Sequence, residues 1–221
     1  MSKENLKKAE KIALTLFDAI EKKGLIKAGK TEEELNNEVY ELSHHLLGTR
    51  KHWHKRIVRS GRNTLMPYKE DPPNLTIQKD DILFFDFGPI LDNWEADLGR
   101  TYVIGEDSSK LKLKTDIEAS WYDAKRWFDN QEDCTGAELF HYVIDLANSH
   151  GWEFGGEIAG HIIGEFPHEK LDPNTYDLYV HPENHKKMKR EINGEKREWI
   201  LEIHFVDRKK EIGGFFEQLL T

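Results

Sequence analysis

Two regions of the chain place hydrophobic residues at helical spacing, and the first region lies near the N-terminus. Residues 2–24 place apolar side chains on one face of a helix, and Gly24 is a natural end for it. Thr31 and Glu34 have the spacing of a capping box, so we expect a second amphipathic helix that begins there and ends at Gly48. The first part of the chain therefore predicts a pair of helices.

The same signals return in the middle of the chain. Apolar residues stand at helical spacing over residues 111–129. Thr135 and Glu138 form another capping-box pattern, ahead of a helix that is expected to stop near Gly151. A second pair of helices is therefore expected, which repeats the pattern of the first pair but not its sequence.

Strand-like patterns follow each pair of helices. After the first pair, Ile57 and Val58 predict a short strand, and two further strands joined by a turn are expected around Asp86 and after Asp97. After the second pair come WILEIHFV and GGFFEQLL, behind a charged run, HPENHKKMKREINGEKRE, that is typical of a solvated loop or hairpin. This order predicts an α+β fold with helices on one face of a largely antiparallel sheet.

Composition narrows the class of protein. The formal net charge of -9 over 221 residues disfavours non-specific nucleic-acid binding. No apolar run approaches the ~20 residues that a membrane helix needs, and the N-terminus shows no secretion signal. Cys134 is the single cysteine, which excludes an internal disulfide and fits a reducing compartment. We therefore expect a cytoplasmic protein without membrane or nucleic-acid partners, with residues 1–221 as one domain.

Five ionisable residues stand among neighbours that look buried: Asp86, Asp97, His161, Glu202 and Glu217. An isolated carboxylate in an apolar interior is very unfavourable, so it must take up a proton, pair with a cation or bind a metal ion. Taken singly, each residue has an ordinary interpretation. An aspartate can lie at a strand edge, a glutamate on a solvated face and a histidine in the core, and the WEAD segment that contains Asp97 could be a surface ribbon. Their order and spacing favour one common explanation.

Divalent metal ions offer that explanation. Arg100 and Arg208 are the close candidates for cationic partners, and two arginines do not balance the set. Four carboxylates balance two divalent ions, and a neutral imidazole adds a ligand without adding charge. An oxygen-rich set with one nitrogen suits Mn²⁺, Fe²⁺, Co²⁺ or Zn²⁺. The sequence therefore predicts two divalent metal ions per chain.

The motifs that carry these residues resemble one known family. DFGPILDNWEADLGRT, AGHIIGEFPHE, ILEIHF and GGFFEQLL present an aspartate, a second aspartate eleven residues later, a histidine in a GHxxG stretch, and two glutamates. With SGRNTLMPY ahead of them, they resemble the methionine aminopeptidase, prolidase and creatinase family, the pita-bread metallopeptidases, over roughly residues 55–221. The resemblance implies a curved antiparallel sheet with helices on its outer face and an internal pseudo-twofold repeat.

The resemblance also implies a role for each predicted ligand. Asp86 would chelate one metal ion with both oxygens, and Asp97 and Glu217 would each bridge the two ions. His161 and Glu202 would complete the second metal site. A hydroxide bridging the ions would attack the peptide carbonyl, and Glu202 would shuttle protons as general base and acid.

The positions that contact the substrate match the family less closely than the predicted metal ligands do. His168 matches a second histidine that, in this family, lines the site and contacts the substrate. The family has another histidine ahead of the first aspartate strand, and this chain has Tyr68 there. His52 or His54 is a candidate to replace it in binding substrate and protonating the leaving amine, although an HxH pattern on an exposed loop is also typical of plain surface.

The function implied by the resemblance is that of a dinuclear-metal-dependent peptidase. It would act on short peptides as an aminopeptidase or an Xaa-Pro-type dipeptidase, and a homodimer is compatible with this reading. In size the chain is nearer to methionine aminopeptidases, because prolidases carry an additional N-terminal domain. Two alternatives stay open. One is a catalytically altered module that binds peptide or protein, and the other is a hydrolase of a non-peptide C–N bond, which creatinase-like relatives cleave without metal.

Overall fold

The structure is a computed structural model, and its helices and strands follow the predicted order closely. It describes residues 2–66, 68–168, 176–192 and 194–221. Pro67 and Glu169, which belong to two of the quoted motifs, lie outside these ranges. The helices are α1 (Ser2–Lys22), α2 (Glu32–Leu47), the 3-10 helix η1 (Gly61–Leu65), α3 (Ser108–Asn130) and α4 (Gly136–His150). The strands are β1 (Ile57–Ser60), β2 (Asp81–Phe87), β3 (Ile90–Leu91), β4 (Trp94–Glu95), β5 (Leu98–Ile104), β6 (Glu153–Phe154), β7 (Ile162–Ile163), β8 (Glu191–Ile192), β9 (Glu195–Lys196), β10 (Glu198–Asp207) and β11 (Ile212–Leu219).

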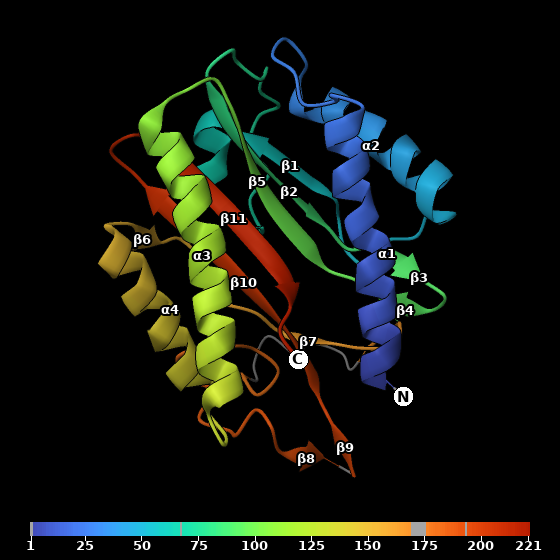
Figure 1. The fold of residues 1–221 in the computed structure, drawn as a ribbon, viewed down its shortest axis with the longest axis vertical. Helices are drawn as coiled ribbons and strands as arrows, with labels where there is room; N and C mark the ends of the chain where they lie inside the picture. Colours follow the sequence, from blue (N-terminus) through green and yellow to red (C-terminus); the bar gives the residue numbers. More distant parts are fainter. Residues whose placement is uncertain (1, 67, 169–175, 193) are drawn as a thin grey trace.

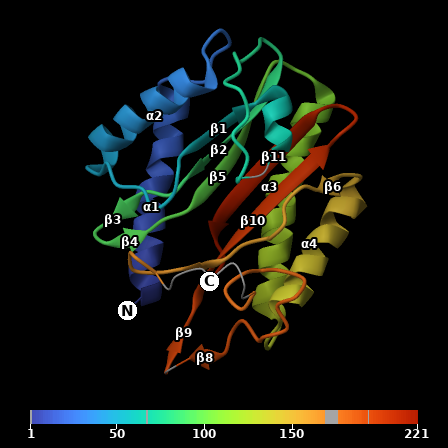
Figure 2. The ribbon, with the colours of Figure 1, turned by 180° about the vertical axis from the view of Figure 1, so that it is seen from behind.

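One antiparallel sheet forms the centre of the molecule. Its strands lie in the order β1-β2-β5-β11-β10-β6, and β7 also pairs with β10. Helices α1 and α3 pass in front of these strands in Figure 1 and behind them in Figure 2, so both cover the same face of the sheet. The expected α+β architecture, with helices on one face of an antiparallel sheet, is confirmed.

Local capping signals explain where the helices begin. Thr31 and Glu34 form reciprocal capping-box hydrogen bonds at the start of α2, and Thr135 and Glu138 do the same for α4. Both helices end at a glycine in the left-handed conformation, as expected. Helix α3 begins earlier than the apolar pattern indicated, because the Asp107 carboxylate accepts hydrogen bonds from two backbone N–H groups of its first turn.

Two large hydrophobic cores lie beneath the helices, one for each helical pair, and a smaller cluster forms around Leu6 of α1. The core under α1 and α2 includes Phe17 and Phe85. The core under α3 and α4 includes Trp121 and Phe205. Each pair buries its apolar face against its own part of the sheet, so the duplicated sequence pattern corresponds to two halves of one fold.

The connection between β2 and β5 is more elaborate than the single turn that was expected. Strands β3 and β4 form a short ribbon, with positive φ angles of 49° at Asp92 and 67° at Asn93, as in tight hairpin turns. The surface interpretation of WEAD is wrong, because Glu95 is 1% and Asp97 is 4% exposed. The buried carboxylate of Glu95 is stabilised by a hydrogen bond that it accepts from the backbone N–H of Gly164.

The last third of the chain holds the longest strand pair. β10 and β11 pair antiparallel along the whole length of β11. The charged run ahead of β10 contains the β8–β9 hairpin, one of the two forms expected for it. Within the part of the chain that the structure describes, no helix combines the length and the apolar character needed to cross a bilayer.

Candidate metal centre

One row of the sheet gathers three of the predicted ligands. From β1 across to β10, the strand registers align Ile57, Asp86, Gly99, Glu217 and Glu202. Residues at directly opposed positions project from the same face of a sheet. The side chains of Asp86, Glu217 and Glu202 therefore converge, and all three line one cavity.

Gly99 separates Asp86 from Glu217 in this row, and its lack of a side chain keeps the space between them open. A Cβ at Gly99 would lie 2.4 Å from Phe215 Cδ1 and 2.9 Å from Glu217 Cβ. Packed atoms cannot approach so closely without displacement. The glycine therefore allows the two carboxylates to share one site.

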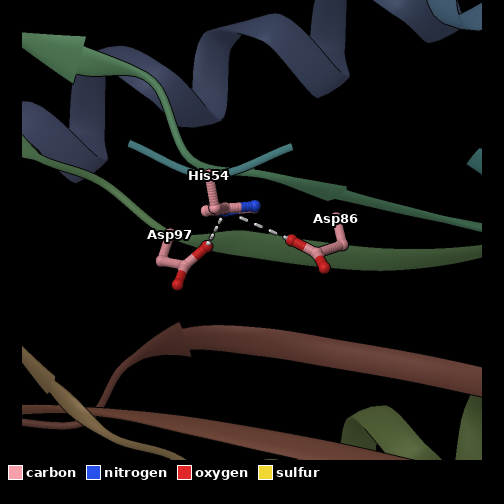
Figure 3. Close-up of side chains that lie close together, drawn as sticks. All are labelled: His54, Asp86 and Asp97. Atoms are coloured by element: carbon pink, nitrogen blue, oxygen red, sulfur yellow. Dashed lines mark hydrogen bonds and ion pairs between the residues drawn. The ribbon is translucent and has the colours of Figure 1, made fainter. Parts of the chain in front are cut away.

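Asp97 immediately precedes β5 and lies between two histidines. His161 Nε2 is 3.2 Å from Asp97 Oδ2, and His54 Nε2 is 3.0 Å from Asp97 Oδ1. His54 Nε2 is also 3.5 Å from Asp86 Oδ1. Figure 3 shows the His54 imidazole between the two carboxylates. Residues far apart in sequence thus meet in one buried cluster.

Burial and mutual repulsion raise the pKa values of three of the four carboxyl groups. Burial, opposed by the charge of His54 and assisted by Asp97, raises the pKa of Asp86 to about 7. Burial also raises the pKa of Glu202. Burial and the charges of the other three carboxylates raise the pKa of Glu217 well above its ordinary value. These carboxyl groups need a positive charge nearby to ionise.

The two histidines respond to the same charges in the opposite sense. Burial lowers the pKa of His54, but the charges of Asp86 and Asp97 outweigh it and raise that pKa to about 9. Burial also opposes the charged form of His161, and its hydrogen bond and charge interaction with Asp97 raise its pKa to about 9. Burial raises the pKa of Asp97, but the two histidines together lower it to about 2. The imidazoles are therefore the cations closest to the cluster.

The two arginines that were candidate partners for these charges bind elsewhere. Arg100 Nη1 donates hydrogen bonds to the backbone carbonyls of Gly99 and Glu217, not to the carboxylates. Arg208 Nε forms an exposed ion pair with Glu153 at 3.3 Å. Arg100 follows Gly99, a member of the carboxylate row, and therefore faces the other side of the sheet, because side chains alternate between the two faces of a strand.

The donor set fits divalent metal ions. Two groups offer ligand atoms that all lie within 4.8 Å of one another, namely His54 with Asp86 and Asp97, and Asp97 with His161 and Glu217. Glu217 Oε2 is buried and has no hydrogen-bond partner within the described part of the chain. Four ionised carboxylates and two protonated imidazoles sum to −4 + 2 = −2, whereas two divalent ions with neutral imidazoles give −4 + 4 = 0. Metal binding would therefore neutralise the cluster.

His168 lies beside His161 but is turned toward another partner. Its Nδ1 is 2.6 Å from Glu95 Oε2, and its ring lies parallel to that of His161 with centroids 6.4 Å apart. The ring of Trp53 meets both imidazoles edge-on, with its centroid 5.3 Å from each. Trp53 is among the described residues that line the cavity, and His168 is not.

The three candidates for substrate binding separate into two groups. Tyr68 and His54 line the cavity, with ring centroids 5.8 Å apart. His52 is not among the described lining residues and packs against Tyr40, with ring centroids 6.0 Å apart. The two histidines of the HWH motif therefore have different surroundings.

The cavity has a volume of about 420 Å³. A second row of the sheet, two residues along each strand from the carboxylate row, supplies part of its wall: Arg59, Phe84, Phe215 and His204. Burial lowers the pKa of His204 to about 4, so its ring is neutral at pH 7. Lys69 and Glu157 also line the cavity and form an exposed ion pair at 2.8 Å.

Sequence reasoning missed Arg59 and His204 as cavity residues. The signal that could have identified them is the period of two along a strand. His204 is two residues after Glu202, and Arg59 is two residues after Ile57, the residue opposite Asp86.

Comparison with known proteins identifies the family of this chain. The chain matches the sequence profile of Metallopeptidase family M24 over residues 4–193 and belongs to that family. No curated protein sequence is significantly similar to it.

Solved structures show the same fold at low sequence identity. A prolidase from Thermococcus sibiricus is 22% identical, with a TM-score of 0.74 over 98% of this chain and 57% of that chain. An X-Pro aminopeptidase from Thermotoga maritima is 22% identical, with a TM-score of 0.74 over 99% of this chain and 60% of the other. A methionine aminopeptidase from Rickettsia prowazekii is 19% identical, with a TM-score of 0.68 over 97% of this chain and 90% of the other. The chain thus has the pita-bread fold and spans less than two thirds of the first two relatives.

Proposed function

We propose that this protein is a dinuclear metallopeptidase that releases N-terminal residues from short peptides, as an aminopeptidase or an Xaa-Pro-type dipeptidase. The observation that carries the proposal is the convergence of Asp86, Glu217 and Glu202 in one row of the sheet, beside Asp97 and His161. Membership of family M24 supports it. Buried carboxylates at this density are unfavourable unless cations neutralise them.

The ligand assignment follows from position. Asp97 belongs to both groups of ligand atoms, so it is one proposed bridging residue. Glu217 belongs to the second group and lies between Asp86 and Glu202 in the carboxylate row, so it is the other proposed bridging residue. Asp86 binds the first ion, and His161 with Glu202 binds the second. The cobalt, iron, manganese and zinc dications all accept such oxygen and nitrogen ligands.

Glu202 is the proposed proton carrier. It is only partly buried, whereas Glu217 is 2% exposed, so Glu202 is the carboxylate more accessible to a substrate. Two divalent ions supply Lewis acidity to a peptide carbonyl and to a water molecule. Glu202 would accept the proton of that water and deliver it to the leaving amine.

Short peptides suit the cavity. Its volume of about 420 Å³ lies at the lower end of the range of small-ligand sites, ~300–1,000 Å³. Its aromatic and aliphatic wall can receive an uncharged side chain or a proline ring. Tyr68 is 47% exposed and lines the cavity, so we propose that it contacts bound substrate. His168 is proposed to act on the site through Trp53, whose ring meets both His168 and His161.

A peptide panel tests the proposal. Chelator-stripped protein is reloaded with Mn²⁺, Co²⁺ or Zn²⁺ and incubated with Ala-Pro, Ala-Pro-Ala and Met-Ala-Ser, and released residues are measured by mass spectrometry. We expect hydrolysis that requires metal and falls at least ~100-fold in Glu202→Gln, the usual scale for loss of a general base. Glu153→Gln, which removes an exposed carboxylate, is the matched control and should keep full activity. Metal-loaded protein that cleaves none of these peptides, or activity that survives chelation, would contradict the proposal.

A further inference from the structure

His54 is a buried histidine that the five-ligand set leaves without a role. Only 7% of its side chain is exposed, and Nε2 lies 3.0 Å from Asp97 and 3.5 Å from Asp86. Both carboxylates are proposed metal ligands, and the three side chains offer donor atoms within 4.8 Å of one another. An imidazole nitrogen in this place can reach the same ion as the two oxygens.

The other ring nitrogen of His54 fixes its tautomer. Nδ1 lies 2.7 Å from the backbone carbonyl oxygen of Lys55. A carbonyl oxygen can only accept, so Nδ1 carries the proton and donates it. In the neutral ring, the lone pair is then on Nε2 and points to Asp86 and Asp97 (Figure 3). A hydrogen bond from the distal nitrogen to a carbonyl is the usual support for a metal-binding histidine.

His161, the predicted nitrogen ligand, has the same arrangement on the other side of Asp97. Its Nδ1 lies 2.8 Å from the carbonyl oxygen of the next residue, Ile162, just as His54 bonds the carbonyl of its own next residue. His161 Nε2 approaches Asp97 Oδ2, and His54 Nε2 approaches Asp97 Oδ1. The two imidazoles therefore hold equivalent places, one at each oxygen of the shared carboxylate.

The segment that carries His54 is held firmly against the end of β2. The Trp53 backbone N–H donates to the Gly88 carbonyl at 2.9 Å, and Trp53 Nε1 donates to the Ala96 carbonyl at 3.2 Å. Gly88 makes this approach feasible, because a Cβ there would lie 2.3 Å from the His54 ring. His54 is thus placed in advance by the surrounding backbone, as a ligand has to be.

We propose that His54 is a sixth protein ligand, bound to the metal ion that Asp86 holds, so that each of the two ions has one imidazole. The inference rests on the proposed dinuclear site and extends it. An imidazole at both positions favours zinc, cobalt or ferrous iron over manganese or magnesium, which prefer oxygen ligands. The alternative is that His54 serves only as a charged partner of the two aspartates and does not coordinate.

Cobalt binding distinguishes these roles without measuring activity. Chelator-stripped protein is titrated with Co²⁺ by calorimetry, and the loaded protein is examined by X-ray absorption, in which imidazole rings give a distinct scattering pattern. For the unaltered protein we expect two ions per chain and, on average, one imidazole per cobalt. His54→Gln should weaken one of the two sites by at least ~100-fold, beyond the loss typical of a residue that only supports a ligand.

His52→Gln is the matched control, because it removes a histidine from the same segment but outside the cavity. It should bind both ions as the unaltered protein does. Two ions with half an imidazole per cobalt, together with unchanged affinity in His54→Gln, would overturn the inference and leave the dinuclear site standing. Failure of the unaltered protein to bind cobalt would overturn the dinuclear site itself. The imidazole number is measured on unaltered protein, so it decides the question even if the variant misfolds.

Discussion

At the scale of single residues, Gly99 has the most direct effect on the site. It lies in the carboxylate row, where a methyl group would press on the Phe215 ring and on Glu217. Gly99→Ala should therefore push β5 and β11 apart, with a loss of ~1–3 kcal/mol in the free energy of unfolding, as for other overpacked sites. It should also weaken metal binding, because the separation between the carboxylates changes. Urea unfolding and Co²⁺ titration measure the two effects.

Gly164→Ala provides the control for this change. Among the described residues, its added Cβ would meet the Cβ of His168 at 3.4 Å, an ordinary contact. It should leave metal affinity unchanged and unfold near the same urea concentration as the unaltered protein. Equal behaviour of the two variants would contradict the role assigned to Gly99.

Cys134 gives a pH-dependent prediction at the same scale. Its side chain is buried, and burial raises the pKa of its thiol to about 12. Only the thiolate reacts with iodoacetamide, so at pH 8 the folded protein should react at least ~10³-fold more slowly than the urea-unfolded chain, whose thiol has a pKa near 8.5. The folded rate should keep rising about tenfold per pH unit above pH 9, where the unfolded rate levels off. A folded rate that levels off near pH 9 would contradict the buried environment.

Which residues meet at the site could be predicted only where a motif identifies them. Asp86, Asp97, His161, Glu202 and Glu217 were selected as one set, and the structure brings them together. The position of His54 could not be derived, because it lies 43 residues before Asp97 and meets it only through the tertiary fold.

At the scale of elements, the carboxylate of Glu32 ties α2 to the segment that enters the cavity. It accepts hydrogen bonds from the Ser60 backbone N–H, the Asn63 side-chain amide and the Leu75 backbone N–H. Ser60 ends β1, and Asn63 belongs to η1, which leads to cavity residues Met66 and Tyr68. A single buried carboxylate therefore fixes the start of this segment.

Glu32→Gln should destabilise the protein by ~1–3 kcal/mol, since an amide group would face donors that now bind a carboxylate. The neighbouring Glu33→Gln is the control, because Glu33 is exposed and its carboxylate accepts a long hydrogen bond of 3.4 Å from the Asn74 side chain. Thermal unfolding, monitored by circular dichroism, compares the midpoints of the two variants. Equal midpoints would show that the Glu32 network adds no stability.

The sequence predicted elements well where their signals are local. The capping boxes at Thr31 and Thr135 identified the starts of two helices, because both partners lie within four residues. The β3–β4 ribbon was missed, because two-residue strands have too little apolar periodicity to be recognised. The buried position of Glu95 was missed for a related reason: its partners Gly164 and His168 come from a distant loop.

At the scale of the whole molecule, the cluster of carboxylates lies between the two halves of the sheet. Asp86 and Asp97 come from the half under α1 and α2, and Glu202 and Glu217 come from the half under α3 and α4. Metal ions bound to both pairs would join the halves. The duplicated pattern in the sequence anticipated these two halves, but not the register that aligns them, which depends on pairing between distant strands.

Removal of metal should therefore lower the stability of the entire fold. Free metal at about 100 times its dissociation constant adds ~2.7 kcal/mol to the folded state for each site that it fills, which for a chain of this size raises Tm by ~5–10 °C per site. Differential scanning calorimetry with and without chelator measures the shift. Asp86→Asn, which removes a ligand of one of the two ions, should clearly reduce the metal-dependent shift, and a shift of the same size in that variant would contradict binding at this site.

The most direct test of the dinuclear centre is anomalous X-ray diffraction from crystals soaked in Mn²⁺ or Co²⁺. We expect two anomalous peaks per chain, one beside each carboxylate oxygen of Asp97, with His54 near one peak and His161 near the other. The absence of peaks in this cluster, in crystals whose site residues are ordered, would contradict a dinuclear metal centre.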